Sequence, residues 1–228
     1  AGRAALVRAG RRCRPAVRRP GGWRPVSQAT RMKAAHVLAF QGRRLFEAAK
    51  APLWRATWSE VQRKCGGQEK FPSYGEFLGS ATDIYRYLQL ELLRADNTRH
   101  LQDLCTEELW PVIRATGADY EKVRRHYSPE ECRIEWDSTQ AYVCSLGLPE
   151  PEPEKGGGEQ APEGSEQAGK KPLVVIAGAR FFSVMHMAFA PEQVRHTIDD
   201  VIFKSAWDPE KGVEQWRIAY IGGPVTPE

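Results

Sequence analysis

Residues 129–146, PEECRIEWDSTQAYVCSL, decide the fold class because the spacing of apolar residues changes there. Upstream of Pro129, apolar side chains recur at steps of three or four residues, which is the period of an amphipathic helix. Within the stretch, Cys132, Ile134 and Trp136 alternate with charged residues, which is the period of a strand with one buried face. The sequence therefore predicts an α+β domain, with N-terminal helices packed on a curved four-stranded antiparallel sheet.

Helical segments are expected directly upstream of this stretch. Residues 74–95 form one continuous apolar face, and residues 97–117 repeat the pattern with a break or kink expected at Pro111. A shorter amphipathic helix around residues 119–127 is expected to complete the helical half of the domain.

Residues 32–58 also have a helical composition, with a break expected at Pro52. Two interpretations of this segment are open. Its two tryptophans cap the core of the domain, or it is a basic amphipathic helix that lies on RNA, an anionic membrane surface or an acidic partner. In the second case Arg43 and Arg44 are the candidate surface residues.

Three further strands are expected after the first, which ends near Leu146. Residues 173–189 begin with the apolar run LVVIAGARFF, and residues 198–207 and 215–221 follow. The turn DPEKG at 208–212 joins the last two strands into a hairpin.

The segment at 149–172 interrupts the predicted sheet. It contains no aromatic or branched aliphatic residue, so it cannot pack into a core. We interpret it as an acidic loop insertion that acts as a solvated spacer; its acidity could also repel phosphate or attract a basic partner.

Composition excludes several protein classes. With 41% hydrophobic residues in a chain of 228, a substantial core is expected, and no run of eighteen apolar residues predicts a transmembrane helix. The five cysteines are odd in number and form no CxxC motif, which argues against a disulfide framework or a zinc site and fits a reducing compartment.

The charge is unevenly distributed. The first 50 residues hold 13 of the 33 basic residues and a single acid, Glu47, whereas the rest of the chain is net acidic. Prolines and glycines break much of this basic segment. It is an arm that binds nucleic acid, an organelle-targeting peptide or a solvated tail. The candidate RNA-binding residues of the arm are Arg8, Arg11, Arg12, Arg14, Arg18, Arg19, Trp23, Arg24, Arg31 and Lys33.

No motif of catalysis, metal binding or cofactor binding is found. The glycine-rich phosphate loops, GxSxG and HExxH are absent from the sequence. Cys105 and His100 are five residues apart, a poor spacing for a catalytic pair on a helix, and Glu135 and Asp137 are expected on the solvent face. The inward-facing strand positions are expected to be apolar. The sequence therefore predicts a protein that is not an enzyme, with no cofactor and no metal.

A set of elements and positions carries a resemblance to a known family. The set consists of the helix at 74–96, the helix start NTRHLQDLCTEEL at 97–109, the strand at 132–136, the hairpin at 201–213 and the strand WRIAY at 216–220. Together they resemble the Tim-forty-four-like family, a branch of the nuclear transport factor two-like cone fold, over about residues 75–221. The acidic loop at 149–172 departs from the tighter connection of that family.

The resemblance implies a mitochondrial matrix protein at the inner-membrane face that binds rather than catalyses. The family includes the import-motor anchor and a mitochondrial large-subunit ribosomal protein with a basic N-terminal extension on ribosomal RNA. The short, arginine-rich segment before the domain is closer to the ribosomal member.

Three parts are therefore expected: a basic arm at 1–35, a basic amphipathic helical segment at 36–70, and a Tim-forty-four-like domain at 71–228. The favoured function is a structural component of the mitochondrial large ribosomal subunit that contacts ribosomal RNA and neighbouring ribosomal proteins. The alternatives are a peripheral inner-membrane scaffold on anionic lipid, similar to the import-motor anchor, and an accessory subunit of a respiratory or ATP synthase complex.

Overall fold

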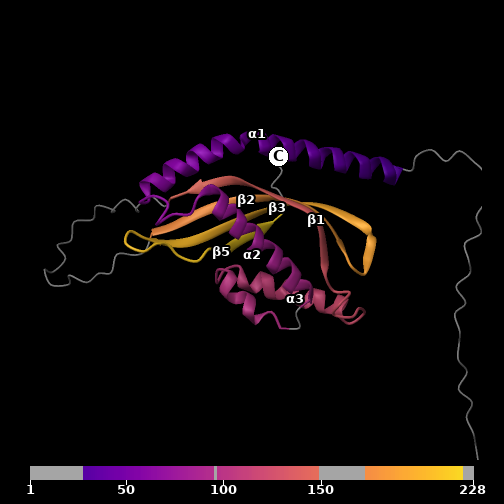
Figure 1. Ribbon diagram of the computed structural model, residues 1–228. Helices are drawn as coiled ribbons and strands as arrows, with labels where there is room; N and C mark the ends of the chain where they lie inside the picture. The colour runs from indigo at the N-terminus through magenta and orange to yellow at the C-terminus, as the bar shows by residue number, and fades with distance from the viewer. Residues whose placement is uncertain (1–27, 95–96, 149–172, 223–228) are drawn as a thin grey trace, which may run out of the picture.

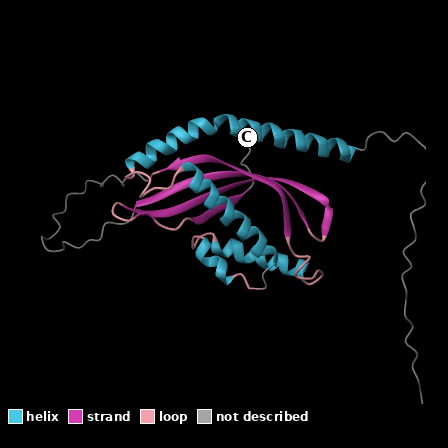
Figure 2. Cartoon of the chain, viewed as in Figure 1, coloured by secondary structure: helices cyan, strands magenta, loops and turns pink. Residues whose placement is uncertain are grey.

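The computed structural model describes residues 28–94, 97–148 and 173–222 (Figure 1). Helices come first and strands follow, so the predicted α+β order is confirmed (Figure 2). The helical elements are α1 (Gln28–Lys64), α2 (Tyr74–Arg94), the 3-10 helix η1 (Arg99–Leu104) and α3 (Trp110–Arg124). The strands are β1 (Ile134–Gly147), β2 (Leu173–Met187), β3 (Ala190–Asp208), β4 (Gly212–Val213) and β5 (Arg217–Gly222).

The strands form one curved antiparallel sheet. β1 pairs with β2, β2 pairs with β3, and β3 pairs with both β4 and β5. The four predicted strands correspond to β1, β2, β3 and β5, and the two-residue β4 is an addition. The predicted turn at 208–212 is confirmed, and Gly212 has a φ of +87° with its backbone against Lys70, where a side chain would clash.

The two faces of the sheet are covered by different helices. Phe181 and Phe182 are neighbours on β2 and point to opposite faces. Phe181 stacks on Tyr85 of α2, with ring centroids 4.3 Å apart, and Phe182 contacts Phe40 of α1 at 5.6 Å. Figure 1 accordingly shows α1 along one face of the sheet and α2 and α3 on the other.

The main core lies between the sheet and α2. Phe77, Ala81, Tyr85, Leu88 and Leu92 are buried at steps of three or four residues, as the sequence predicts. The helix begins with a capping box. The backbone N–H of Ser73 donates to Glu76 Oε2 at 2.7 Å, and the Glu76 N–H donates to Ser73 Oγ at 3.2 Å.

The prediction for the outward and inward faces of β1 is partly wrong. The alternation of Cys132, Ile134 and Trp136, continued along the strand, predicts that Tyr142 and Cys144 lie on the same buried face. Register shifts between Trp136 and Ser138 and between Val143 and Ser145 reverse the alternation, so that Val143 becomes fully buried in the main core. Tyr142 instead contacts Phe182 on the α1 side.

Two helix predictions are also corrected. Pro52 does not break α1, because it lies at an exposed position within a helix that bends over the sheet (Figure 1). The break in 97–117 falls before Pro111: the Thr106 N–H donates to the Ile218 carbonyl at 2.8 Å, so the chain leaves the helix there. Pro111 then occupies the first turn of α3, which needs no N–H donor from it, and α3 continues through Gly117 to Arg124.

Candidate functional site

The predicted RNA-binding residues are only partly described. Arg8, Arg11, Arg12, Arg14, Arg18, Arg19, Trp23 and Arg24 lie outside the described residues. The sequence assigns Arg31 and Lys33 to the arm, but both residues lie within α1, which begins at Gln28. Arg43 is exposed and Arg44 is half-buried, both on α1.

The side of α1 that faces away from the sheet is apolar. Leu38, Leu45, Phe46 and Leu53 expose 73, 65, 59 and 69% of their surfaces. The same side of the helix also exposes small residues and a proline: Ala35, Ala39, Gly42, Ala49, Pro52 and Ala56. Their spacing of three and four residues makes one continuous stripe, which we call the outer face of α1.

Basic residues border the outer face on both flanks. Arg43 and Lys50 are seven residues apart, and Arg44 and Arg55 are eleven, so each pair shares a flank of the helix. The Lys50 Nζ lies 3.9 Å from the centroid of the Phe46 ring. The flanks therefore carry positive charge next to exposed hydrocarbon.

The only acid in the first 59 residues is turned inward. Glu47 is 3% exposed, and its Oε1 accepts a hydrogen bond from Arg180 Nη1 at 2.8 Å. Arg180 also donates twice to Asp200, at 2.6 and 2.7 Å, and this pairing raises the pKa of the guanidinium. Pairing with Arg180 of β2 therefore keeps the Glu47 carboxylate away from the exposed surface of α1.

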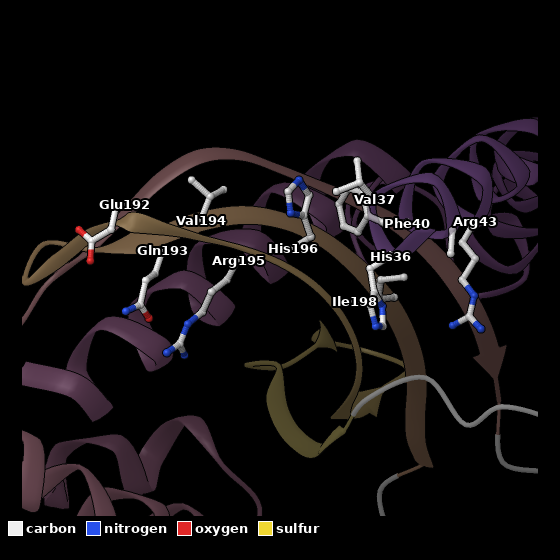
Figure 3. A pocket seen from close by; sticks show the side chains of 11 residues that line it. His36, Val37, Phe40, Arg43, Glu192, Gln193, Val194, Arg195, His196 and Ile198 are labelled. Carbon is white, nitrogen blue, oxygen red and sulfur yellow. The ribbon is translucent and has the colours of Figure 1, made fainter. Parts of the chain in front are cut away.

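An open groove of about 990 Å³ runs between α1 and β3 (Figure 3). From α1 it is lined by His36, Val37, Ala39, Phe40 and Arg43, and from β3 by residues 192–196 and Ile198. The groove lies beside the first part of β3, which begins at Ala190, ten residues before its pairing with β5 starts at Asp200.

The inward-facing strand residues expected to be apolar lie in or against the core, namely Ile134, Trp136, Trp216 and Ile218, but a polar strand residue also faces α2. Tyr85 is fully buried and its hydroxyl donates to Asp199 Oδ2 at 2.6 Å. Burial, followed by the nearby Asp199 carboxylate, raises the pKa of Tyr85. Asp199, which is partly buried, therefore accepts a hydrogen bond from the core residue Tyr85. The sequence does not predict this role, because Ile198 and Asp200 on either side of Asp199 face the opposite side of the sheet and no local pattern singles out Asp199.

The other polar candidates are tied into structural pairs. Glu135 lies 2.9 Å from His186, whose hydrogen bond lowers the pKa of the Glu135 carboxyl, and Asp137 is exposed as expected. His100 pairs with Glu91 at 3.2 Å rather than with Cys105. Within the described ranges no group of histidine, cysteine or acidic side chains is arranged to hold a metal, and no helix is long and apolar enough to cross a membrane.

We expect the buried thiols to react slowly. Burial raises the pKa of both Cys105 and Cys144 to about 11, so almost no thiolate is present at pH 8, whereas an unperturbed cysteine has a pKa of about 8.5. In a Cys13→Ser variant, alkylation of these two cysteines at pH 8 should be at least about a hundredfold slower in the native protein than in urea. Peptide mass spectrometry measures the rates; equal native and unfolded rates would contradict the burial.

Comparison with known proteins adds no relative. No model of a protein family matches the sequence, and no curated protein matches it. The Tim-forty-four-like resemblance therefore stays a prediction, and the site must be interpreted from its own residues.

Proposed function

We propose that the chain is a non-catalytic structural component of the mitochondrial large ribosomal subunit that docks on the anionic inner membrane through the outer face of α1. The observation that carries the membrane contact is an exposed apolar stripe with basic flanks and an inward-turned acid. The ribosomal part of the proposal is supported by the Tim-forty-four-like resemblance and by the excess of basic residues in the first 50 positions. The basic arm binds ribosomal RNA, and the α+β domain, which has the cone-like form of the Tim-forty-four-like family, is the docking body.

A bilayer fits the outer face better than RNA does. An interfacial helix places its large apolar side chains at the boundary of headgroups and acyl chains, while lysines and arginines on its flanks reach the lipid phosphates. RNA would satisfy Arg43 and Arg44 but would leave Leu38, Leu45 and Leu53 in water. The apolar stripe therefore favours a membrane on the outer face.

Flotation with vesicles tests the membrane contact. We expect the combined variant Leu45→Asn, Phe46→Asn and Leu53→Asn to bind vesicles containing cardiolipin at least about tenfold more weakly, because most of the apolar area available to the bilayer is lost. Its stability should change little, since these side chains are exposed. The matched control is Val112→Asn on α3, which is 58% exposed but lies on the opposite side of the sheet.

Unchanged binding of the triple variant, or equal binding of the unaltered chain to neutral vesicles, would contradict the membrane contact.

The ribosomal part of the proposal has a separate test, which is sedimentation of the protein from a gently lysed mitochondrial extract with and without ribonuclease. We expect comigration with the large subunit that is lost on ribonuclease treatment and on deletion of residues 1–27. Ribonuclease-resistant migration with membrane complexes would instead favour a scaffold or an accessory subunit.

A further inference from the structure

The groove between α1 and β3 is lined by two arginines and two histidines. In Figure 3, Arg43 lies at one end of the groove and Glu192 at the other. Arg195, His196 and His36 lie between them. Arg43, Arg195 and His196 are all exposed to solvent. The groove therefore presents separated positive groups, and a ligand with more than one anionic group matches this arrangement better than a single small anion does.

The two arginines of the groove, Arg43 and Arg195, contrast with the arginines that form ion pairs in the folded domain. Arg63, Arg94, Arg125 and Arg180 each pair with a carboxylate at 3.1 Å or less. Over the described ranges, by contrast, neither Arg43 nor Arg195 forms an ion pair, although Glu192 lines the same groove. Two unpaired guanidinium groups in a concave surface are available to an external anion.

Packed aromatic side chains form the base of the groove. Phe40 is only 4% exposed, and its ring packs edge-on against Phe182 at 5.6 Å and against His196 at 5.2 Å. These contacts hold His196 beside the groove, and no polar side chain of the described ranges pairs with its ring. The surface is therefore preformed, and an unstacked base has an imidazole ring on which to lie.

The mixture of polar groups selects between phosphate-bearing ligands. A cardiolipin headgroup in this groove would offer phosphate oxygens to the arginines but only one hydroxyl as a donor to Glu192 and Gln193. A nucleic acid strand offers phosphate oxygens to the arginines and N–H or O–H donors from its bases and sugars to Glu192 and Gln193. The presence of acceptors among the cations favours a polynucleotide.

We infer that the groove between α1 and β3 is a second RNA site, which holds a short single-stranded segment with phosphates at Arg43 and Arg195 and a base against His196. The inference rests on the proposed function for the nature of the polymer, and goes beyond it by placing an RNA contact in the folded domain. Stacking supplies sequence-tolerant affinity, and the arginines supply salt dependence.

The test measures binding of the full chain to a short oligouridine by fluorescence anisotropy over a series of salt concentrations. The variant Arg43→Gln with Arg195→Gln should reduce affinity about three- to tenfold and lower the slope of log K against log salt by about one to two, since two phosphate contacts are lost. The control, Arg114→Gln with Arg217→Gln, removes two exposed arginines away from the groove and should leave both quantities unchanged. Ultraviolet crosslinking to the oligouridine should label peptides that contain residues 36–43 or 192–198.

Several outcomes separate this site from the arm and from lipid. Crosslinks confined to residues 1–27, with unchanged affinity of the groove variant, would overturn the groove as an RNA site while leaving the ribosomal proposal intact. Weaker vesicle binding by Arg195→Gln, with unchanged oligouridine binding, would show a lipid headgroup site instead. A groove that binds oligouridine in a chain that does not sediment with ribosomes would support the site and contradict the proposed function.

Discussion

Replacing Trp58 with alanine is expected to lower the free energy of unfolding by about 3–5 kcal/mol. Trp58 is fully buried, stacks on Phe77 with centroids 4.7 Å apart, and contacts Phe71 at 5.3 Å. Its Nε1 donates to the Pro72 carbonyl at 2.8 Å, which fixes the connection from α1 to α2. The truncation removes this hydrogen bond and leaves a cavity where α1 meets the main core.

Urea denaturation followed by circular dichroism measures the loss. The matched control is Leu53→Ala on the same helix, which is 69% exposed and should change stability by less than about 0.5 kcal/mol. Trp58→Phe should cost less than Trp58→Ala, because it keeps most of the ring contacts and loses the hydrogen bond to Pro72. A Trp58→Ala variant as stable as the unaltered chain would show that α1 is not anchored in the core.

The elements with a strong local signal could be predicted from the sequence. The apolar face of α2, the run at 173–182 that forms most of β2, and the turn at 208–212 need no information from distant residues. The faces of β1 could not be predicted, because its two register shifts depend on pairing with β2 rather than on its own alternation. The helix break predicted at Pro52 is wrong for a related reason, because an exposed position on a curved helix tolerates a missing backbone hydrogen bond.

The sequence predicts only part of the candidate site. α1 has apolar residues on two opposite sides, so the core interpretation and the surface interpretation of this segment both fit its composition. The structure assigns Phe40 and Trp58 to the inner side and Leu38, Leu45 and Leu53 to the outer side. The pairing of Glu47 with Arg180 joins residues 133 positions apart, so no local pattern specifies it. A solitary acid in a basic segment and an arginine inside the run LVVIAGARFF were the available signals of a buried ion pair.

The second large effect is expected from Arg180→Met. This change leaves two carboxylates, Glu47 and Asp200, beneath α1 with side-chain exposures of only 4 and 18% and without the guanidinium that they share. Lys50 Nζ, 3.7 Å from Glu47 Oε1, remains as a partly exposed counter-ion of Glu47. Breaking a buried ion pair is strongly destabilising because the remaining charge is neither hydrated nor neutralised. We expect a loss of about 2–4 kcal/mol, below the usual range for fully buried pairs because Arg180 keeps 23% of its side chain exposed.

A thermodynamic cycle with Glu47→Gln and Asp200→Asn separates this effect from a simple loss of packing. The triple variant Glu47→Gln, Arg180→Met and Asp200→Asn contains no uncompensated charge and should recover more than half of the stability lost by Arg180→Met alone. A loss below about 1 kcal/mol for Arg180→Met, or no recovery in the triple variant, would contradict a charge-based role.

Vesicle flotation measures the effect of the same variants on membrane binding. Arg180→Met frees the carboxylate of Glu47 to turn toward the basic flanks of α1, so binding to anionic vesicles should weaken. The triple variant, in which residue 47 is neutral, should keep that binding, which ties the buried pair to the charge that the outer face presents to the membrane.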